Sequence, residues 1–180
     1  MPIRIYQNKT PTLGKRTFVD PTAVVIGDVT MGDDCSVWPL VVIRGDMHSI
    51  QIGARCSIQD GSVLHITHAS DYNPGGFPLQ IGDDVTVGHK ALLHGCHIED
   101  KVLIGMGAIV MDGAHIESEV ILGAGSLVPP GKRLESGFVY AGAPVKKVRP
   151  LSDKEHTFFA YTAANYVRLK DQHAAENYEA

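Results

Sequence analysis

The chain has 180 residues, 44% of them hydrophobic and 20% charged, which is the composition of one folded domain and not of a disordered or collagen-like chain. Its 16 Lys and Arg against 20 Asp and Glu give a net charge of −4, which disfavours a nucleic-acid partner. No apolar run approaches the ~20 residues of a membrane helix, no secretory leader begins the chain, and the three cysteines lack the CxxC spacing of a metal site, so we expect a cytoplasmic protein with no membrane association.

After an N-terminal segment, residues 1–12, a six-residue repeat runs from about residue 13 to 135. Its first position is aliphatic, its second is often glycine, and its fifth is small or β-branched. A period of six fits neither a helix nor a plain strand. It predicts an all-β solenoid, a parallel β-helix with three units per turn, the first side chain inside, and turns stacked about 4.8 Å apart. The aliphatic positions are Val19, Val25, Met31, Val37, Ile43, Ile52, Ile58, Leu64, Ile81, Val87, Leu93, Ile98, Ile104, Val110, Ile116, Leu122 and Val128.

Three histidines fall at informative positions of this repeat. If residues 70–80 are an excursion, Leu64 and Leu93 begin the same face one turn apart, so His65 and His94 stack directly. His89 lies on the preceding face and does not reach them around the corner. In a threefold trimer, however, one face of each subunit meets a different face of its neighbour, and His89 of the neighbour then completes a three-histidine cluster.

Other polar residues line the two walls of this predicted seam. Arg44 falls one turn below His65, and Gln59 and Asp60 lie on the face of His89. Three neutral imidazoles around an open position are typical of catalytic zinc, although cobalt and ferrous iron also bind imidazole. Zinc supplies hydroxide at neutral pH, which attacks an electrophile such as CO₂. The alternatives are unconnected surface histidines and a structural zinc ion that joins the trimer, which would need a fourth protein ligand.

The pattern changes after the repeat. Residues 136–151 contain Gly142-Ala-Pro144 and Pro150, which predict a turn-rich connector. From Ser152 to 176 we expect a helix, because Ser152 and Glu155 form a capping box and one apolar stripe follows it. We expect that helix to pack on the outside of the solenoid.

Four motifs of the chain resemble those of the gamma-class carbonic anhydrases, and most closely their bacterial carbonic-anhydrase-like branch. The resemblance covers nearly the whole repeat region and the C-terminal helix. It implies a left-handed β-helix, a homotrimer, a zinc ion held by His65, His89 and His94, and CO₂ and bicarbonate as substrate and product. The motifs are Arg44-Gly-Asp46, Gln59-Asp60-Gly-Ser-Val-Leu-His65, Gly88-His89 and His94-Gly95.

The resemblance also implies roles for residues around the metal. Arg44 and Asp46 would support the interface and the rim of the site, and Gln59 would hydrogen-bond the metal-bound water. Asp60 would be an interface partner of arginine, and Tyr166 a helix tyrosine that reaches the site. For Asp46 and Asp60 the alternative is a structural ion pair with Arg44, and for Tyr166 it is plain helix packing.

The chain departs from the family pattern where protons are moved. Met47 stands where the archetypal enzyme has a glutamate, and the loop after the first ligand is shorter, with His68 at or near the position of the shuttling glutamate. His68 or His48 could therefore serve as the proton shuttle, because imidazole titrates near neutral pH. The alternative is that each is an idle surface residue; we favour that alternative for His48 and keep His68 as the candidate. We expect hydration of CO₂ that is slow or conditional.

Two other functions fit the same fold. Hexapeptide-repeat solenoids include coenzyme-A-dependent acyltransferases, in which one histidine acts as base between subunits. Three converging histidines argue against that activity, because one would suffice. The other alternative is a non-catalytic, metal-binding trimer, which the missing acidic shuttle favours.

Overall fold

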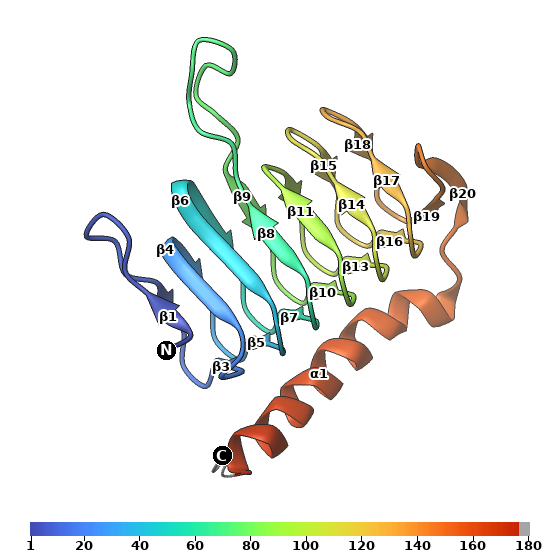
Figure 1. Ribbon diagram of the computed structural model, residues 1–180. Coiled ribbons are helices and arrows are strands. Elements are labelled where there is room, and N and C mark those ends of the chain that lie inside the picture. The colour runs from blue at the N-terminus through green and yellow to red at the C-terminus, as the bar shows by residue number, and fades with distance from the viewer. Residues whose placement is uncertain (177–180) are drawn as a thin grey trace.

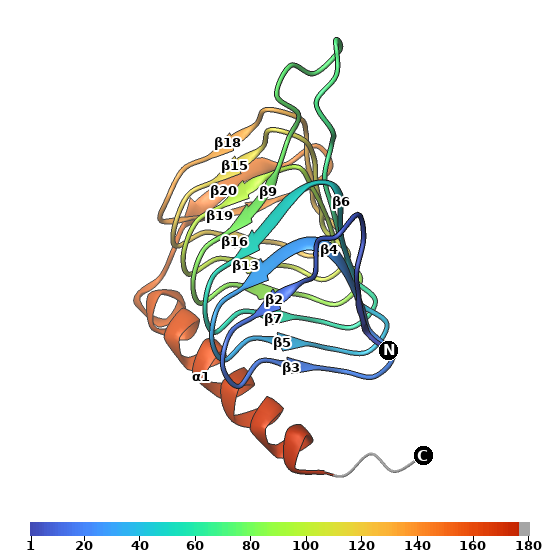
Figure 2. The same cartoon turned by 90° about the vertical axis from the view of Figure 1, so that its left-hand side faces the viewer.

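The computed structural model describes residues 1–176 as a three-sided coil with one helix along its outside (Figures 1 and 2). Viewed along its axis, the coil is a stack of triangular turns. This is the parallel β-helix that the six-residue period predicts. Within the described residues, no helix is both long enough and apolar enough to span a bilayer.

Two sides of the triangle belong to one 12-stranded sheet, which bends around the long strands β4 (Val24–Met31) and β6 (Val42–Ile52). One branch of the sheet continues through β8, β11, β14 and β17, and the other through β9, β12, β15 and β18. Their bounds are β8 (Val63–His65), β9 (Leu79–Ile81), β11 (Leu92–His94), β12 (His97–Ile98), β14 (Ile109–Val110), β15 (His115–Ile116), β17 (Leu127–Val128) and β18 (Arg133–Leu134). Two N-terminal strands, β1 (Ile3–Arg4) and β2 (Thr12–Leu13), pair with β4.

The third side is an 8-stranded sheet that lies beneath the helix. Its strands are β3 (Phe18–Val19), β5 (Ser36–Val37), β7 (Ser57–Ile58), β10 (Thr86–Val87), β13 (Leu103–Ile104), β16 (Ile121–Leu122), β19 (Phe138–Ala141) and β20 (Lys146–Pro150). All pairs in it are parallel except β19 with β20. These last two strands occupy the segment for which the sequence predicts turns, and β1 lies within the predicted N-terminal segment.

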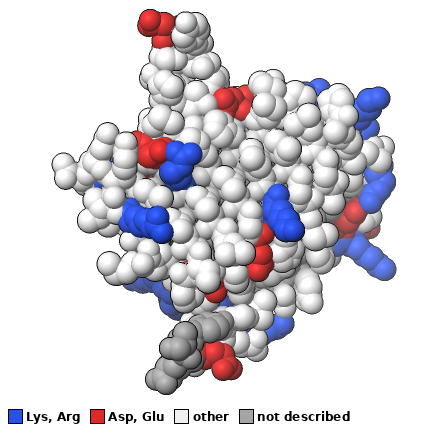
Figure 3. All heavy atoms as spheres, in the orientation of Figure 1, with Lys and Arg blue, Asp and Glu red and all other residues white. Residues whose placement is uncertain are grey.

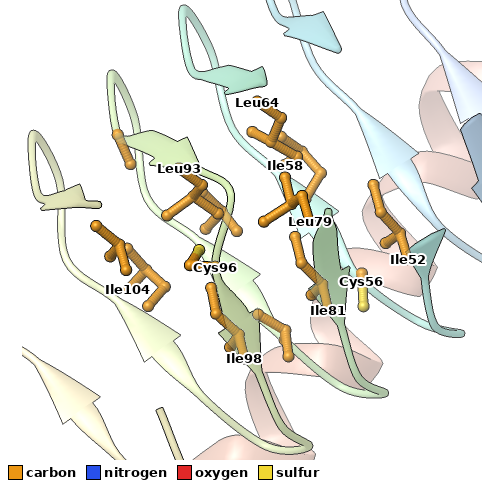
Figure 4. Packing of buried hydrophobic residues seen from close by; sticks show 14 of the residues in the cluster. Ile52, Cys56, Ile58, Leu64, Leu79, Ile81, Leu93, Cys96, Ile98 and Ile104 are labelled. Carbon is orange, nitrogen blue, oxygen red and sulfur yellow. The ribbon is translucent and has the colours of Figure 1, made fainter. Parts of the chain in front are cut away.

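The interior is filled by the aliphatic first position and the small fifth position of each unit. Leu64, Leu93 and Ile98 are fully buried and lie inside the coil (Figure 4). Cys56 and Cys96 point into the same interior and are free thiols. Burial raises the pKa of Cys96, so its thiol stays protonated. The cysteines are therefore small core residues.

One corner of the triangle carries a column of charged residues in left-handed backbone conformation, with φ between 55° and 59°. In chain order the column alternates in sign through consecutive turns: Arg16, Asp34, Arg55, Asp84, Lys101 and Glu119. Ion pairs join the members two by two, at 2.8 Å from Arg16 Nε to Asp34, 2.7 Å from Arg55 Nε to Asp84 and 3.7 Å from Lys101 to Glu119. We call these residues the charge column.

The outward side chains of the 12-stranded sheet form two contrasting rows. The apolar face consists of side chains in register on successive strands: Val24, Val42, Val63, Leu92, Ile109 and Leu127. The polar face consists of Thr30, Gln51, Gln80, His97, His115 and Arg133, equally in register. In Figure 3 the apolar face is turned toward the viewer, and charged side chains are sparse on it.

The helix α1 (Asp153–Ala175) runs along the 8-stranded sheet, as predicted. It begins with the capping box of Ser152 and Glu155, in which each side chain bonds the backbone of the other. Phe159 and Ala163 are buried against the sheet. Near its end, the ammonium group of Lys170 is buried and lies 3.3 Å from Asp34 of the charge column. These contacts fix the helix, with Tyr166 on it, over the face of the coil that carries Gln59.

Candidate functional site

His65 and His94 stand at the ends of β8 and β11, and the two strands pair with these residues opposite one another. The register predicted from the repeat is therefore confirmed. Nδ1 of His65 lies 3.1 Å from Nε2 of His94. The other nitrogen of each ring meets a carboxylate: Nε2 of His65 donates to Asp46 at 3.0 Å, and Nδ1 of His94 donates to Asp112 at 2.6 Å.

This arrangement fits a metal ion. When both rings are neutral, their protons lie on the nitrogens that face the carboxylates, so two lone pairs face one another across 3.1 Å with no hydrogen between them. A cation relieves that repulsion. Two nitrogens bound at about 2.0–2.1 Å to one tetrahedral zinc ion lie about 3.3 Å apart, close to the spacing here. Carboxylates that hold the distal nitrogens are the usual outer partners of metal-binding histidines.

Arg44 and Asp46 set the charge at the rim of this pair. Arg44 forms an ion pair with Asp46, which is the structural pairing considered for this aspartate. Burial raises the pKa of Asp46, but hydrogen bonds from Arg44 and His65 outweigh it and hold the pKa below its usual value. Burial lowers the pKa of His65, and the positive charge of Arg44 adds to that effect. Asp46 is thus an anion at neutral pH and His65 a neutral imidazole, the form that binds metals.

His89 lies on another corner of the coil, as the face count predicts. Its Nδ1 is 2.9 Å from Asp60, which lies one turn below it. Asp60 therefore contacts His89 within the chain, whereas Arg44 contacts Asp46. Among residues 1–176 of a single chain, no three His, Cys, Asp or Glu side chains are grouped so as to hold a metal ion.

Gln59, His89 and Tyr166 line one groove between α1 and the 8-stranded sheet, with a volume of about 430 Å³. Gln59 is buried, and Tyr166 reaches it from the helix. Burial raises the pKa of Tyr166, while a hydrogen bond with Gln59 acts in the opposite direction, so the phenol remains protonated at neutral pH. Tyr166 also packs edge-on against Trp38, with ring centroids 6.3 Å apart. Both the packing role and the site role considered for Tyr166 thus have contacts in the structure.

His68 follows β8 at the base of a loop, residues 67–78, that projects from the coil (Figure 1). The loop is a hairpin closed by a bridge between Thr67 and Phe77. The His68 side chain is exposed, as a group that exchanges protons with solvent must be. Met47 is also exposed, near the rim formed by Asp46. His48 bonds the loop backbone at Gly75, with 3.2 Å between Nε2 and the carbonyl oxygen.

Two residues of the site were missed by sequence reasoning. Asp112 holds His94, although it belongs to the following turn. Extending the face count by one turn, to Val110, would have placed Asp112 beside His94. Thr86 lines the groove of Gln59 and Tyr166 with a buried hydroxyl, and no sequence motif marks it.

Comparison with protein families finds hexapeptide repeats. The description "Bacterial transferase hexapeptide (six repeats)" matches residues 10–45 and 95–130, and "Hexapeptide repeat of succinyl-transferase" matches residues 78–111. Together with the three-sided parallel coil, these matches identify the fold as a left-handed β-helix.

Several curated proteins are similar over most of the chain. Protein YrdA of Escherichia coli is 59% identical over 95% of this chain and 93% of its own length. "Carbonic anhydrase" of Geobacillus kaustophilus is 44% identical over 83% of this chain and 79% of its own. "Gamma carbonic anhydrase 1, mitochondrial" of Arabidopsis thaliana is 43% identical over 94% of this chain, which spans 62% of that protein.

A solved structure agrees closely with this fold. The hexapeptide transferase family protein from Anaplasma phagocytophilum superposes with a TM-score of 0.86 at 35% identity, over 94% of this chain and 96% of that one.

Proposed function

The chain belongs to the gamma carbonic anhydrase family of hexapeptide-repeat proteins, and from that membership we propose that it catalyses the reversible hydration of CO₂ to bicarbonate at a zinc site shared between subunits. One observation carries the proposal. The nitrogens of His65 and His94 face one another across 3.1 Å, and a carboxylate holds the distal nitrogen of each ring. Such a pair is two-thirds of a three-histidine site.

The third ligand in this proposal is His89 of a neighbouring subunit in a homotrimer. Support comes from the apolar face, which lies directly beside His65 and His94. Its side chains of Val63, Leu92 and Ile109 are 38%, 37% and 40% exposed in the single chain. A continuous row of exposed aliphatic side chains marks a surface that another protein covers. A heterologous contact of this kind closes into a ring, so each subunit gives two imidazoles to one site and one to the next.

A zinc ion bound by three imidazoles supplies hydroxide at neutral pH, because it lowers the pKa of a coordinated water to about 7. The residues around it hold and orient the reactants. Gln59 offers a buried amide beside His89. Tyr166 contacts Gln59 from the helix through a hydrogen bond that lowers the pKa of the phenol, so Gln59 is the donor and the phenol oxygen the acceptor. The carbonyl oxygen of Gln59 and its second N–H remain for the substrate or the nucleophile.

Charged residues frame the entrance of the proposed site. Asp46 orients His65, and Arg44 neutralises Asp46 and presents positive charge where bicarbonate leaves. Asp60 orients His89 by its hydrogen bond to Nδ1, which directs Nε2 toward the neighbouring subunit. Proton release falls to His68, whose exposed imidazole can pass a proton to buffer. With Met47 in place of a carboxylate, we expect turnover that rises with buffer concentration.

The test combines metal content, mass and activity. We expect a trimer with about one zinc ion per subunit and CO₂ hydration in stopped flow. His89→Ala should lose zinc and hydration, while His97→Ala, on the polar face, should keep both. Hydration that survives removal of the metal, or a monomer that is fully active, would refute the proposal. A zinc-containing trimer without turnover at any pH would identify a non-catalytic metal-binding module instead.

Acyl transfer is the second candidate, and the His89–Asp60 pair favours it. A histidine oriented by a carboxylate is also the arrangement of a general base. Titration with acetyl-coenzyme A separates the two functions. Saturable binding that His89→Ala abolishes would support acyl transfer, whereas we expect no saturable binding.

A further inference from the structure

The groove between α1 and the 8-stranded sheet extends well beyond the proposed metal site. Its floor is a column of outward side chains on successive turns, Thr86, Leu103 and Ile121, which are in register. Phe158, Thr162 and Tyr166 of the helix form its other wall. From Gln59 to Ile121 the groove passes three turn spacings, or about 14 Å. One end of this groove therefore lies at the site, and the rest leads away from it along the coil.

Thr86 is the polar exception in this floor. Its side chain is only 4% exposed, and within the described residues its Oγ1 is the buried side-chain oxygen that lacks a hydrogen-bond partner. The residue below it in register, Ser57, accepts a hydrogen bond from Trp38 Nε1 at 3.0 Å. A buried hydroxyl without a partner has lost its hydrogen bonds to water and gained none in exchange, which is unfavourable. That cost is removed when the side chain turns its hydroxyl into the groove and a ligand oxygen accepts the proton.

The lining also restricts the charge of what can enter. Among the described residues, none that lines the groove is Lys, Arg, Asp or Glu, and His89 stands only at the end beside the site. An anion such as bicarbonate would lose its hydration there without gaining a counter-charge, which is strongly unfavourable. An uncharged molecule that carries hydrogen-bond acceptor oxygens meets no such penalty. The groove thus discriminates between the two sides of the proposed reaction.

We propose that this groove is the compartment for CO₂, which it holds beside the site with the Thr86 hydroxyl donating to one of its oxygens. The inference rests on the proposed function and deepens it. CO₂ is uncharged and has no net dipole, so the aliphatic walls suit it, and 430 Å³ accommodates several such molecules in succession. Bicarbonate leaves instead past Arg44 on the charged rim. Thr86 is a substrate-binding residue in this scheme.

The direct test is crystallographic. Crystals of the full-length protein, as purified, are pressurised with CO₂ and frozen, and a second set is pressurised with xenon. We expect elongated density in the groove with one oxygen within hydrogen-bond distance of Thr86 Oγ1, and xenon in the same groove. Thr86→Val should admit xenon as before and hold CO₂ with several-fold lower occupancy. A water molecule that keeps its place on the hydroxyl under CO₂ pressure, or a neighbouring subunit that fills the groove, would overturn the inference.

Stability and kinetics provide the control. Because Thr86→Val replaces an unpartnered hydroxyl with a methyl group, we expect unchanged or higher stability, together with a rise of about twofold to tenfold in KM for CO₂ at constant kcat. A variant that is less stable would mean that the hydroxyl has a structural partner and would overturn the inference. Thr162→Leu, on the opposite wall, narrows the groove and should lower the occupancy of both CO₂ and xenon in it.

The binding and hydration experiments together distinguish a failure of this inference from a failure of the proposed function on which it rests. CO₂ absent from the groove of an enzyme with normal hydration overturns the groove and leaves the function standing. CO₂ on Thr86 in a protein without hydration supports the binding site and overturns the function.

Discussion

The apolar face and the polar face are two sides of one sheet, built over the same interior. Both rows alternate with buried aliphatic residues of the repeat, and both have one residue per turn in register. Outside, one row runs through valine, leucine and isoleucine and the other through glutamine, histidine and arginine. Since the interior is common to both, the repeat explains the coil, and only the residues at the outward positions distinguish the two faces.

The histidines repeat this contrast. Beside the apolar face, His94 is held by Asp112 and turns its other ring nitrogen toward His65. On the polar face, His115 is held by Glu99 at 2.7 Å, but its other nitrogen accepts from Arg133 at 3.2 Å, and its ring stacks on His97 with centroids 4.6 Å apart. Each pair thus sets two imidazoles side by side, with ring planes tilted by 56° for His65 and His94 and nearly parallel, at 8°, for His97 and His115. Only those beside the apolar face retain lone pairs that face one another.

The largest expected effect comes from charge on the apolar face. Leu92→Glu should dissociate the assembly into monomers and abolish zinc binding, because an unpaired buried charge costs about 3–5 kcal/mol at each interface. Light scattering and metal analysis measure both. Gln80→Glu, on the polar face, is the matched control and should remain assembled. Identical behaviour of the two variants would contradict an interface confined to the apolar face.

Next comes the interior that the faces share. Leu93→Ala, beneath the apolar face, and Ile116→Ala, beneath the polar face, each empty a fully buried site. Each should lower the free energy of unfolding by about 2–5 kcal/mol, through lost burial and the cavity left behind. Denaturant titration of the subunit measures this. A cost confined to one of the two would contradict the claim of a common core.

Substitution of the carboxylates that orient the histidines should have a smaller effect, on zinc affinity alone. Asp112→Asn should weaken zinc affinity about 10-fold to 100-fold, because it removes the anion that holds His94. Glu99→Gln makes the same change at His115 and should leave zinc affinity unaltered. Competition with a chromophoric chelator compares them. Equal losses would place the metal somewhere other than beside His94.

The smallest expected effect is on thermal stability and comes from Glu155, at the start of the helix that covers the third side of the coil. The bond from Arg149, and then those from Ser152, hold the pKa of Glu155 below its usual range. A lowered carboxyl pKa adds stability above the unfolded value of about 4.3, and that stability is lost as the pH falls below it. Glu155→Gln should therefore lower Tm by about 1–3 °C at pH 7, with a difference that shrinks below about pH 4. A difference that persists into acid would show that the charge is not the cause.

Much of the fold was predictable because the six-residue period is recognised from the residue type at each position, without knowledge of any contact in space. The aliphatic first positions fix which side chains are inside, and counting units places His65 against His94 and Asp60 below His89. That count needs only the lengths of the insertions. Strands β19 and β20 were not predicted, because Gly142 and Pro144 mark a turn without showing that its flanks pair with the coil.

The site was predictable only in part, for a different reason. Register places Cα atoms, whereas the reach of a side chain decides contacts, so Asp112 on the following turn was missed although it holds His94 at 2.6 Å. The pairing of Asp60 with His89, and of Arg44 with Asp46, also depends on rotamers. The unpartnered hydroxyl of Thr86 arises where the helix covers the sheet, which no local pattern in either segment encodes.

The charge column has a consequence for how such a coil can lengthen. Arg16, Asp34, Arg55, Asp84, Lys101 and Glu119 alternate in sign from turn to turn. Duplicating a single turn would set two like charges about 4.8 Å apart, whereas duplicating two consecutive turns would preserve every attraction. Because of this corner, insertion of an even number of turns keeps the charges alternating, whereas insertion of an odd number places two like charges side by side. The electrostatic cost of lengthening the coil is therefore lowest for an even number of turns.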